Sequence, residues 1–170
     1  MEKEERIQTS KYLGEEDIVD RIRLFLINKE KGNWHEDKAK VAGLHQRGAD
    51  LIMRGGKKNG EHFIIECKGK SYAQSARSAN CEGWIHALGQ IITRMNTART
   101  IQSGSQKGQP NRAYKYGLGL YWKSAQTALR RIPKTIATTL NLHIFSVNEE
   151  GEVKQFTPSA FGTKYENSEF

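Results

Sequence analysis

The sequence contains little cysteine: Cys67 and Cys81 are the two thiols in 170 residues. Two thiols do not make the disulfide framework of a small secreted domain, and Cys81 with His86 alone supplies too few ligands for a structural zinc site. The chain also lacks any run close to the ~18 apolar residues that a membrane span requires, and it begins with charged residues. We therefore expect a cytoplasmic protein that is neither secreted nor inserted into a membrane.

Acidic residues are outnumbered by basic ones. The sequence has 19 Asp and Glu against 27 Lys and Arg, which gives a formal charge of +8. This balance favours association with polyanions, and nucleic acid is the natural candidate. A chain of this length can bury one adequate core. We expect a single domain over residues 1–170, with frayed tails at 1–11 and 162–170.

Hydrophobic periodicity and turn residues together predict an α/β protein. Ile18, Ile22 and Leu26 recur at helical spacing, and Pro133 interrupts a later helical stretch. Residues typical of turns separate the strands of two hairpins. The predicted order is a helix at 15–28, a weak strand at 38–43, hairpin strands at 48–54 and 61–69, a helix at 82–98, a strand at 114–122, a helical segment from 124, and hairpin strands at 142–147 and 153–156.

Asp50 and the sequence Glu66-Cys67-Lys68 are the most informative residues of the chain. The turn between them is centred near residues 57 and 58, so antiparallel pairing joins residues whose numbers sum to 115 or 116. Asp50 should therefore lie opposite Glu66 or one residue diagonal to it, and directly opposed residues have Cβ atoms about 4.5–5.5 Å apart. Two carboxylates at that separation can share one hard cation, which offsets their repulsion.

The Glu-x-Lys pattern of Glu66 also occurs twice elsewhere, at Glu36 and at Glu152. Glu36 lies in a polar stretch and Glu152 follows a turn-like segment, so both are predicted to be solvated charges. Glu66 instead follows the apolar run at 63–65, which indicates a strand buried on both faces and argues against an exposed ion pair. We therefore select Glu66 as the candidate site residue.

These residues resemble the motif of the PD-(D/E)xK nuclease superfamily, which includes restriction endonucleases and archaeal Holliday-junction resolvases. Gly48-Ala49-Asp50 stands at the first acidic motif, with Ala49 where the family often has proline, and Glu66-Cys67-Lys68 stands at (D/E)xK. The resemblance extends over most of the chain in the order of elements. It implies an α/β restriction-endonuclease-like fold with an αβββαβ core, in which helices flank a central mixed sheet. It also implies Mg²⁺-dependent cleavage of DNA, with Mn²⁺ as a substitute metal.

A metal-dependent site of this kind needs oxygen ligands and a positive charge near the phosphate. Asp50 and Glu66 supply two carboxylates, which suffice because Mg²⁺ keeps several waters and takes substrate oxygens as well. The resemblance adds the backbone carbonyl of Cys67 as a further metal ligand, while its thiol should face the core. Lys68, on the same strand face as Glu66, would orient the water or stabilise charge at phosphorus.

Two helices are expected to contribute to the site. The resemblance implies a third carboxylate, for metal binding and catalysis, from the first helix, where Glu15 precedes an apolar pair and Glu16 is the alternative. Either residue also suits the acidic first turn that complements a helix dipole. In the second helix, Gln90 stands where the family has a glutamine that reaches toward the active site, although a solvated helix face explains this residue equally well.

Basic residues supply the expected nucleic-acid contacts, because lysine and arginine bind phosphates without reading sequence. DNA, duplex or branched, is the expected partner, and a homodimer is compatible with the sequence. Two alternatives remain open: a nucleic-acid-binding module without turnover, and a structural subunit of a defence or repair complex. A thiol enzyme built on Cys67 or Cys81 is a minor alternative. The expected contact residues are His45, Arg47, Lys57, Lys58, Lys70, Lys107 and Arg112.

Overall fold

The computed structural model describes residues 13–28, 34–37, 49–55, 61–70, 76–95, 105 and 114–162, without the side chains of 76–81. Within these ranges the chain forms four α-helices, six β-strands and one short 3-10 helix. The helices are α1 (Glu15–Asn28), α2 (Ala76–Arg94), α3 (Trp122–Arg131) and α4 (Lys134–Leu140), and the 3-10 helix η3 is Pro158–Ala160. The strands are β1 (His35–Glu36), β2 (Leu51–Gly55), β3 (Glu61–Lys68), β4 (Tyr114–Tyr121), β5 (Leu142–Val147) and β6 (Val153–Phe156).

The six strands form one mixed sheet whose spatial order follows the chain, β1-β2-β3-β4-β5-β6. β1, β2 and β3 are antiparallel neighbours, β3, β4 and β5 run parallel, and β6 returns antiparallel to β5. Parallel neighbours require crossover connections, and these contain α2 between β3 and β4, and α3 with α4 between β4 and β5. The predicted α/β class, with a central mixed sheet flanked by helices, is therefore confirmed.

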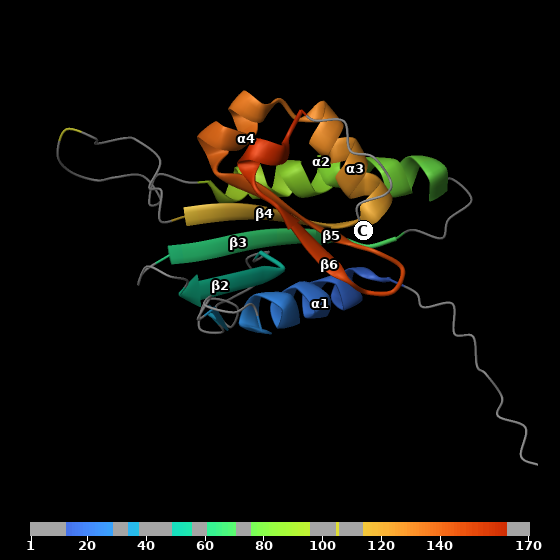
Figure 1. Cartoon of the computed structure of the whole chain (residues 1–170), viewed down its shortest axis with the longest axis horizontal. Helices are drawn as coiled ribbons and strands as arrows, with labels where there is room; N and C mark the ends of the chain where they lie inside the picture. Colours follow the sequence, from blue (N-terminus) through green and yellow to red (C-terminus); the bar gives the residue numbers. More distant parts are fainter. Residues whose placement is uncertain are drawn as a thin grey trace, which may run out of the picture.

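Helices cover both faces of the sheet: α1 lies on one face, and α2, α3 and α4 lie on the other (Figure 1). The α1 layer buries Ile18, Ile22 and Leu26, which share one side of the helix, against sheet residues that include Phe63 and Phe145. A second buried cluster joins α2, α3 and α4 to the opposite face. In the part of the chain that the structure describes, no helix is long and apolar enough to cross a membrane.

Close packing of α1 on the sheet depends on a glycine in β4. A Cβ added at Gly119 would lie 2.6 Å from Cδ1 of Ile22 in α1 and 2.5 Å from Sγ of Cys67 in β3. Both separations are shorter than van der Waals contact, so a side chain here would force its neighbours apart. Glycine at this position therefore lets α1 lie against β3 and β4, the strands at the centre of the sheet.

Most elements predicted from the sequence are confirmed. The first helix covers the predicted residues 15–28, and β5 and β6 match the predicted second hairpin. Pro133 separates α3 from α4, as expected. Helix α2 begins at Ala76, before the predicted residue 82, because the prediction relied on an apolar spacing that 76–81 lack. The predicted strand at 38–43 lies outside the described residues. The edge strand next to β2 is formed by His35–Glu36.

Candidate active site

The hairpin of β2 and β3 holds Asp50 next to Glu66. Its register pairs Leu51 with Ile65 and continues along both strands, so that paired residue numbers sum to 116, as predicted. Asp50 immediately precedes β2. When the register is continued by one residue, Asp50 lies opposite Glu66. The Asp50 carboxylate is fixed there because its Oδ2 accepts a hydrogen bond of 2.6 Å from the backbone N–H of Cys67.

The Glu66 carboxylate is buried between β3 and α2. Its side chain is 1% exposed, and its Oε1 accepts a hydrogen bond of 2.8 Å from Nε of Arg94, the last residue of α2. Burial raises the pKa of Glu66, the hydrogen bond from Arg94 lowers it, and the neighbouring Asp50 charge raises it again, so that the pKa lies above its ordinary value. The negative charge of Glu66 is therefore unfavourable unless further positive charge is close by.

Two buried acceptor oxygens have no hydrogen-bond donor among the residues that the structure describes: Oε2 of Glu66 and Oε1 of Gln90. Gln90 precedes Arg94 by one turn of α2, so both side chains project from the same side of that helix. A buried acceptor without a donor costs about 1–3 kcal/mol, and the cost is greater for a charged oxygen. Oxygens of both kinds are ligands that Mg²⁺ takes in proteins. The carboxylate oxygens of Asp50 and Glu66 therefore fit a hard cation. The amide oxygen of Gln90 is buried rather than on a solvated helix face.

Lys68 is the last residue of β3, and its side chain points to the same face of the sheet as that of Glu66. Its Nζ lies 3.0 Å from Oε2 of Glu15, the first residue of α1. The start of α1 reaches the end of β3 because Gly69 has no side chain: a Cβ there would lie 2.5 Å from the backbone nitrogen of Glu15. Both predicted helix carboxylates are exposed, and Glu15 is the one that contacts Lys68.

The thiol of Cys67 points away from the carboxylates, as predicted. The residue is fully buried in the cluster that α1 forms with the sheet. This burial raises the pKa of the thiol well above its usual value, and the charge of Asp50 raises it further. A thiol that is kept neutral in an apolar cluster is neither a nucleophile nor a metal ligand. Cys67 therefore contributes to the site through its backbone, whose N–H already binds Asp50.

The acidic side chains form a pair rather than a larger cluster. Within the described ranges, no three or more His, Cys, Asp or Glu side chains are grouped so that they could hold a metal ion. Glu15, predicted as a third metal ligand, is instead ion-paired with Lys68. Two carboxylates are enough for Mg²⁺, because waters and substrate oxygens complete its coordination. Asp50 and Glu66 therefore remain the candidate ligand pair.

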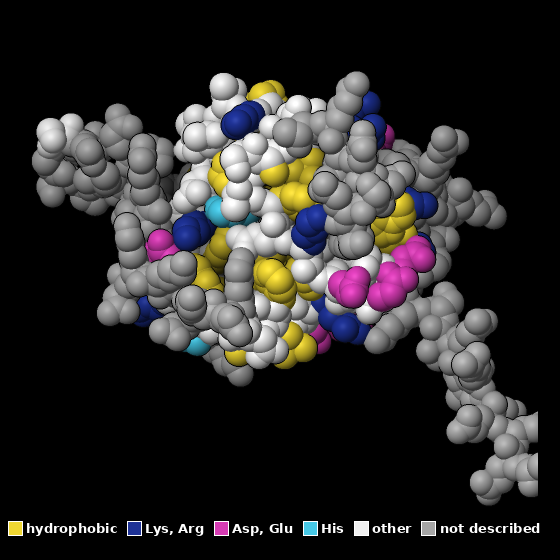
Figure 2. Space-filling model, viewed as in Figure 1, with side chains coloured by type: hydrophobic (Ala, Val, Ile, Leu, Met, Phe, Trp, Pro, Cys, Tyr) yellow, Lys and Arg dark blue, Asp and Glu magenta, His cyan; other side chains and the backbone are white. Residues whose placement is uncertain are grey.

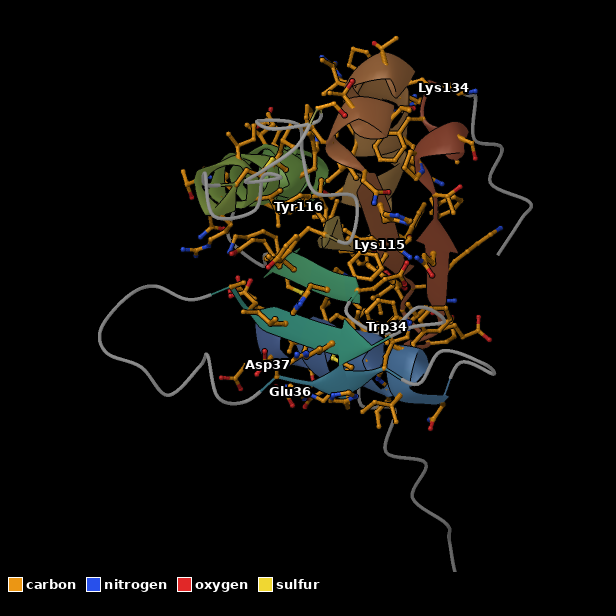
Figure 3. All side chains as sticks on the ribbon, turned by 90° about the vertical axis from the view of Figure 1, so that its left-hand side faces the viewer. Trp34, Glu36, Asp37, Lys115, Tyr116 and Lys134 are labelled. Atoms are coloured by element: carbon orange, nitrogen blue, oxygen red, sulfur yellow. The ribbon has the colours of Figure 1, made fainter. Side chains whose placement is uncertain are left out.

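Another carboxylate of β3 lies at the opposite end of the strand. Oε2 of Glu61 is 3.2 Å from Nζ of Lys115, and this Nζ lies 5.7 Å from the centre of the Trp34 ring. Lys115 and Trp34 lie close together at the edge seen in Figure 3, where the parallel strands β3 and β4 begin. The candidate site lies where these strands end. Glu61 is therefore a matched control for Glu66, with the same charge on the same strand.

The prediction that Glu36 is a solvated charge was wrong. Glu36 belongs to β1, its side chain is 18% exposed, and its Oε2 lies 3.0 Å from Nε of Arg23 in α1. The polar sequence around Glu36 concealed an edge strand that α1 covers. Glu152 is exposed, as predicted, and its backbone and carboxylate both bind the Asn148 side chain across the turn between β5 and β6.

Arg94 is the site residue that sequence reasoning did not single out. Its position four residues after Gln90 was the available signal, because residues at that spacing share a helix face. The predicted tail at 1–11 and residues 163–170 of the predicted tail at 162–170 lie outside the described residues. The same is true of the predicted contact residues His45, Arg47, Lys57, Lys58, Lys107 and Arg112, whose positions stay predictions. Gly162, where the second tail was predicted to begin, is not frayed, because its N–H donates to the carbonyl of Leu129 over 2.7 Å.

Comparison of the chain with protein-family models, with curated proteins and with solved structures finds no match. Its function is therefore inferred from the residues at the end of β3. These are two adjacent carboxylates, a lysine held by a third carboxylate, and Arg94 of α2, which binds Glu66.

Proposed function

We propose that this protein is a Mg²⁺-dependent nuclease that hydrolyses DNA phosphodiester bonds at a site formed by Asp50, Glu66 and Lys68. The observation that carries the proposal is the buried Oε2 of Glu66, which lacks a donor in the described part of the chain and lies next to the charge of Asp50. A cation satisfies such an oxygen best, and the Asp50 carboxylate adds to the negative charge beside it. The formal charge of +8 supports a polyanionic substrate.

The order of elements supports a restriction-endonuclease-like core. α1 is followed by the antiparallel strands β1, β2 and β3, and then by α2 and by β4, which is parallel to β3. This is the αβββαβ order that the resemblance to PD-(D/E)xK nucleases implies. Because one fold can host many functions, the chemistry of the site carries more weight than the order of strands.

Asp50, Glu66 and the backbone carbonyl of Cys67 would hold the ion. When bound, Mg²⁺ supplies Lewis-acid activation of the phosphate and acidifies a water, and Mn²⁺ is a suitable substitute because it also prefers oxygen ligands. The chain prepares these ligands in advance. The N–H of Cys67 orients the Asp50 carboxylate, and Arg94 binds one oxygen of Glu66 and leaves the other for a ligand.

Lys68 supplies the positive charge that the reaction needs near phosphorus. Its side chain is 23% exposed, so its charge is screened less than that of a fully solvated lysine. Ordering a lysine side chain costs up to about 2 kcal/mol of rotamer entropy, and the contact with Glu15 meets part of that cost before substrate binds. Lys68 is thereby positioned to orient a water or a phosphate oxygen, and Glu15 is its positioning residue.

Cleavage assays on linear, nicked, branched and single-stranded DNA test the proposal. We expect cleavage with Mg²⁺ or Mn²⁺, none in EDTA, and a rate lower by about 100-fold or more in Glu66→Gln and in Lys68→Ala. Glu66→Gln removes a charged ligand of the ion, and Lys68→Ala removes the positive charge near phosphorus. Glu61→Gln removes a carboxylate of the same strand, whose partner is Lys115, and should cleave at the wild-type rate.

Two results would count against the nuclease. An unchanged rate in folded Glu66→Gln would refute the site. Salt-dependent DNA binding by a wild-type protein that cleaves none of the substrates with either metal would favour a nucleic-acid-binding module without turnover.

A further inference from the structure

Three parallel strands end at the same edge of the sheet, and residues at their ends form a second polar cluster. Lys70 lies two residues beyond β3, Tyr121 is the last residue of β4, and Glu149 lies two residues beyond β5. Acidic side chains gather over the turn between β5 and β6 (Figure 2), which contributes Glu149 and Glu150. Ligands of open α/β sheets commonly bind at the carboxyl ends of strands. The cluster adjoins the candidate active site, since one residue separates Lys70 from Lys68.

Two hydrogen-bond donors converge on one oxygen of Glu149. The Tyr121 hydroxyl donates to Oε1 over 2.8 Å, and Nζ of Lys70 donates to the same atom over 3.3 Å. Tyr121 is 2% exposed, so the surrounding protein holds its hydroxyl in place, whereas the Glu149 side chain is 57% exposed. The hydrogen bonds from Tyr121 and Lys70 lower the pKa of Glu149, as expected of donors arranged around an anion.

Lys70 and Lys123 each lie over an aromatic ring. Nζ of Lys70 is 5.3 Å from the centre of the Tyr121 ring, and Nζ of Lys123 is 5.3 Å from that of Trp122. The two ring centres are 5.9 Å apart. Cation–π contacts hold an ammonium in place without neutralising its charge. Two positive charges therefore act on the position that the Glu149 carboxylate fills, and Lys123 contributes to the field there.

Glu149 lies in a turn whose backbone is held by hydrogen bonds of its own. The N–H of Gly151 donates to the carbonyl of Asn148, which makes Glu149 and Glu150 the central residues of a four-residue turn. The Asn148 side chain donates to the carboxylate of Glu152 and accepts from its N–H, both at 2.8 Å. Because the backbone is held independently, Glu149 can leave its two donors by rotation of its side chain alone.

We infer that the Tyr121 hydroxyl and the Lys70 ammonium form a phosphate-oxygen site beside the active site, which Glu149 fills until a nucleic-acid strand displaces it. A carboxylate oxygen and a phosphate oxygen accept the same donors at similar distances, so Glu149 stands in for the ligand. Its displacement costs little, because exposed ion pairs contribute only about 0–1 kcal/mol. That the phosphate belongs to a nucleic-acid strand rests on the proposed function, and free phosphate is the other source of the same chemistry.

Two neighbouring substitutions separate this site from a general effect of charge. Glu149→Gln and Glu150→Gln each remove one negative charge from the same turn, but Glu149 is the residue that the two donors bind. Affinity for a fluorescent DNA duplex is measured by anisotropy in EDTA, so that no cleavage occurs. We expect Glu149→Gln to bind about two- to fivefold more tightly than Glu150→Gln. The difference should vanish when Lys70→Ala is added to both variants.

Titration of the same variants with inorganic phosphate at constant ionic strength, followed by calorimetry, distinguishes the two sources. A DNA difference without phosphate binding assigns the site to a strand. Phosphate binding that is stronger in Glu149→Gln, without a DNA difference, assigns it to free phosphate. Equal behaviour of the two variants toward both ligands would overturn the inference, because net charge alone would then explain binding.

These measurements do not depend on catalysis. A protein that shows the expected DNA difference in EDTA but cleaves no substrate with Mg²⁺ or Mn²⁺ would refute the nuclease and leave the phosphate site standing. A protein that cleaves DNA but binds it equally well in both variants would refute the phosphate site and leave the nuclease standing.

Discussion

Replacing Asp50 with asparagine should make the metal-free protein more stable and remove its response to metal. Asparagine keeps an oxygen that can accept the hydrogen bond from the Cys67 N–H, which Asp50 accepts at 2.6 Å. It carries no charge, however, so it no longer repels Glu66 and no longer attracts a cation. The substitution therefore separates the charge of Asp50 from its shape.

The size of the effect follows from the hairpin register. Directly opposed residues have Cβ atoms about 5 Å apart, and two unit charges at that separation repel by about 3 kcal/mol at an effective dielectric constant of about 20. Loss of the charge from the hydrogen bond with Cys67 costs about 1 kcal/mol. The expected net gain is about 2 kcal/mol, which raises the Tm of a chain of this size by roughly 4–8 °C.

Thermal unfolding in EDTA, followed by circular dichroism, measures this gain. With Mg²⁺ at about ten times its Kd, the wild type should gain about 1.4 kcal/mol, or roughly 3–6 °C in Tm, and Asp50→Asn should not respond. Asp37→Asn, the same chemical change beside β1 (Figure 3), is the matched control. A lower Tm of Asp50→Asn in EDTA, or an undiminished response to Mg²⁺, would refute the reasoning.

Two further substitutions test contacts around the site. Gly69→Ala should destabilise the fold by roughly 1–3 kcal/mol, because the new Cβ would lie 2.5 Å from the backbone nitrogen of Glu15. If the free energy of unfolding in urea fell by less than about 0.5 kcal/mol, the start of α1 would have moved readily to make room for the side chain. Glu149→Gln should be less stable than the wild type at neutral pH but not in acid. Hydrogen bonds from Tyr121 and Lys70 lower the pKa of Glu149 in the folded state, so the carboxylate adds stability above its ordinary pKa, and this is lost as the pH falls through the lowered value. Urea unfolding curves of the two proteins should therefore converge at acidic pH. A difference in unfolding free energy that stays the same at every pH would contradict the stabilising role of the Glu149 charge.

Features that depend on neighbours in the chain could be predicted from the sequence. The turn and the alternation of its strands placed the first hairpin, and the predicted register holds in β2 and β3. Apolar spacing identified α1, and turn residues identified the hairpin of β5 and β6. The opposition of Asp50 and Glu66 was predictable for this reason, because it follows from one turn and two short strands.

Contacts between distant elements were not predictable in the same way. Arg94 meets Glu66 across 28 residues, and Glu149 meets Lys70 across 79. Periodicity shows which side of a helix or strand is buried, but not which charged side chain of another element lies opposite. The partners of Glu66 and Lys70 therefore became visible only when the helices and turns were placed on the sheet.

The sequential order of the strands has a consequence for the order of folding. Each strand pairs with the next strand of the chain, but β2 and β3 are separated by residues 56–60, and β3 and β4 by residues 69–113. A hairpin forms in about 1–10 μs, whereas a contact across a long loop is delayed by the entropy of closing it. We expect the hairpin that brings Asp50 to Glu66 to form, like that of β5 and β6, before β3 pairs with β4. The two like charges then meet early in folding, before α2 docks and supplies Arg94.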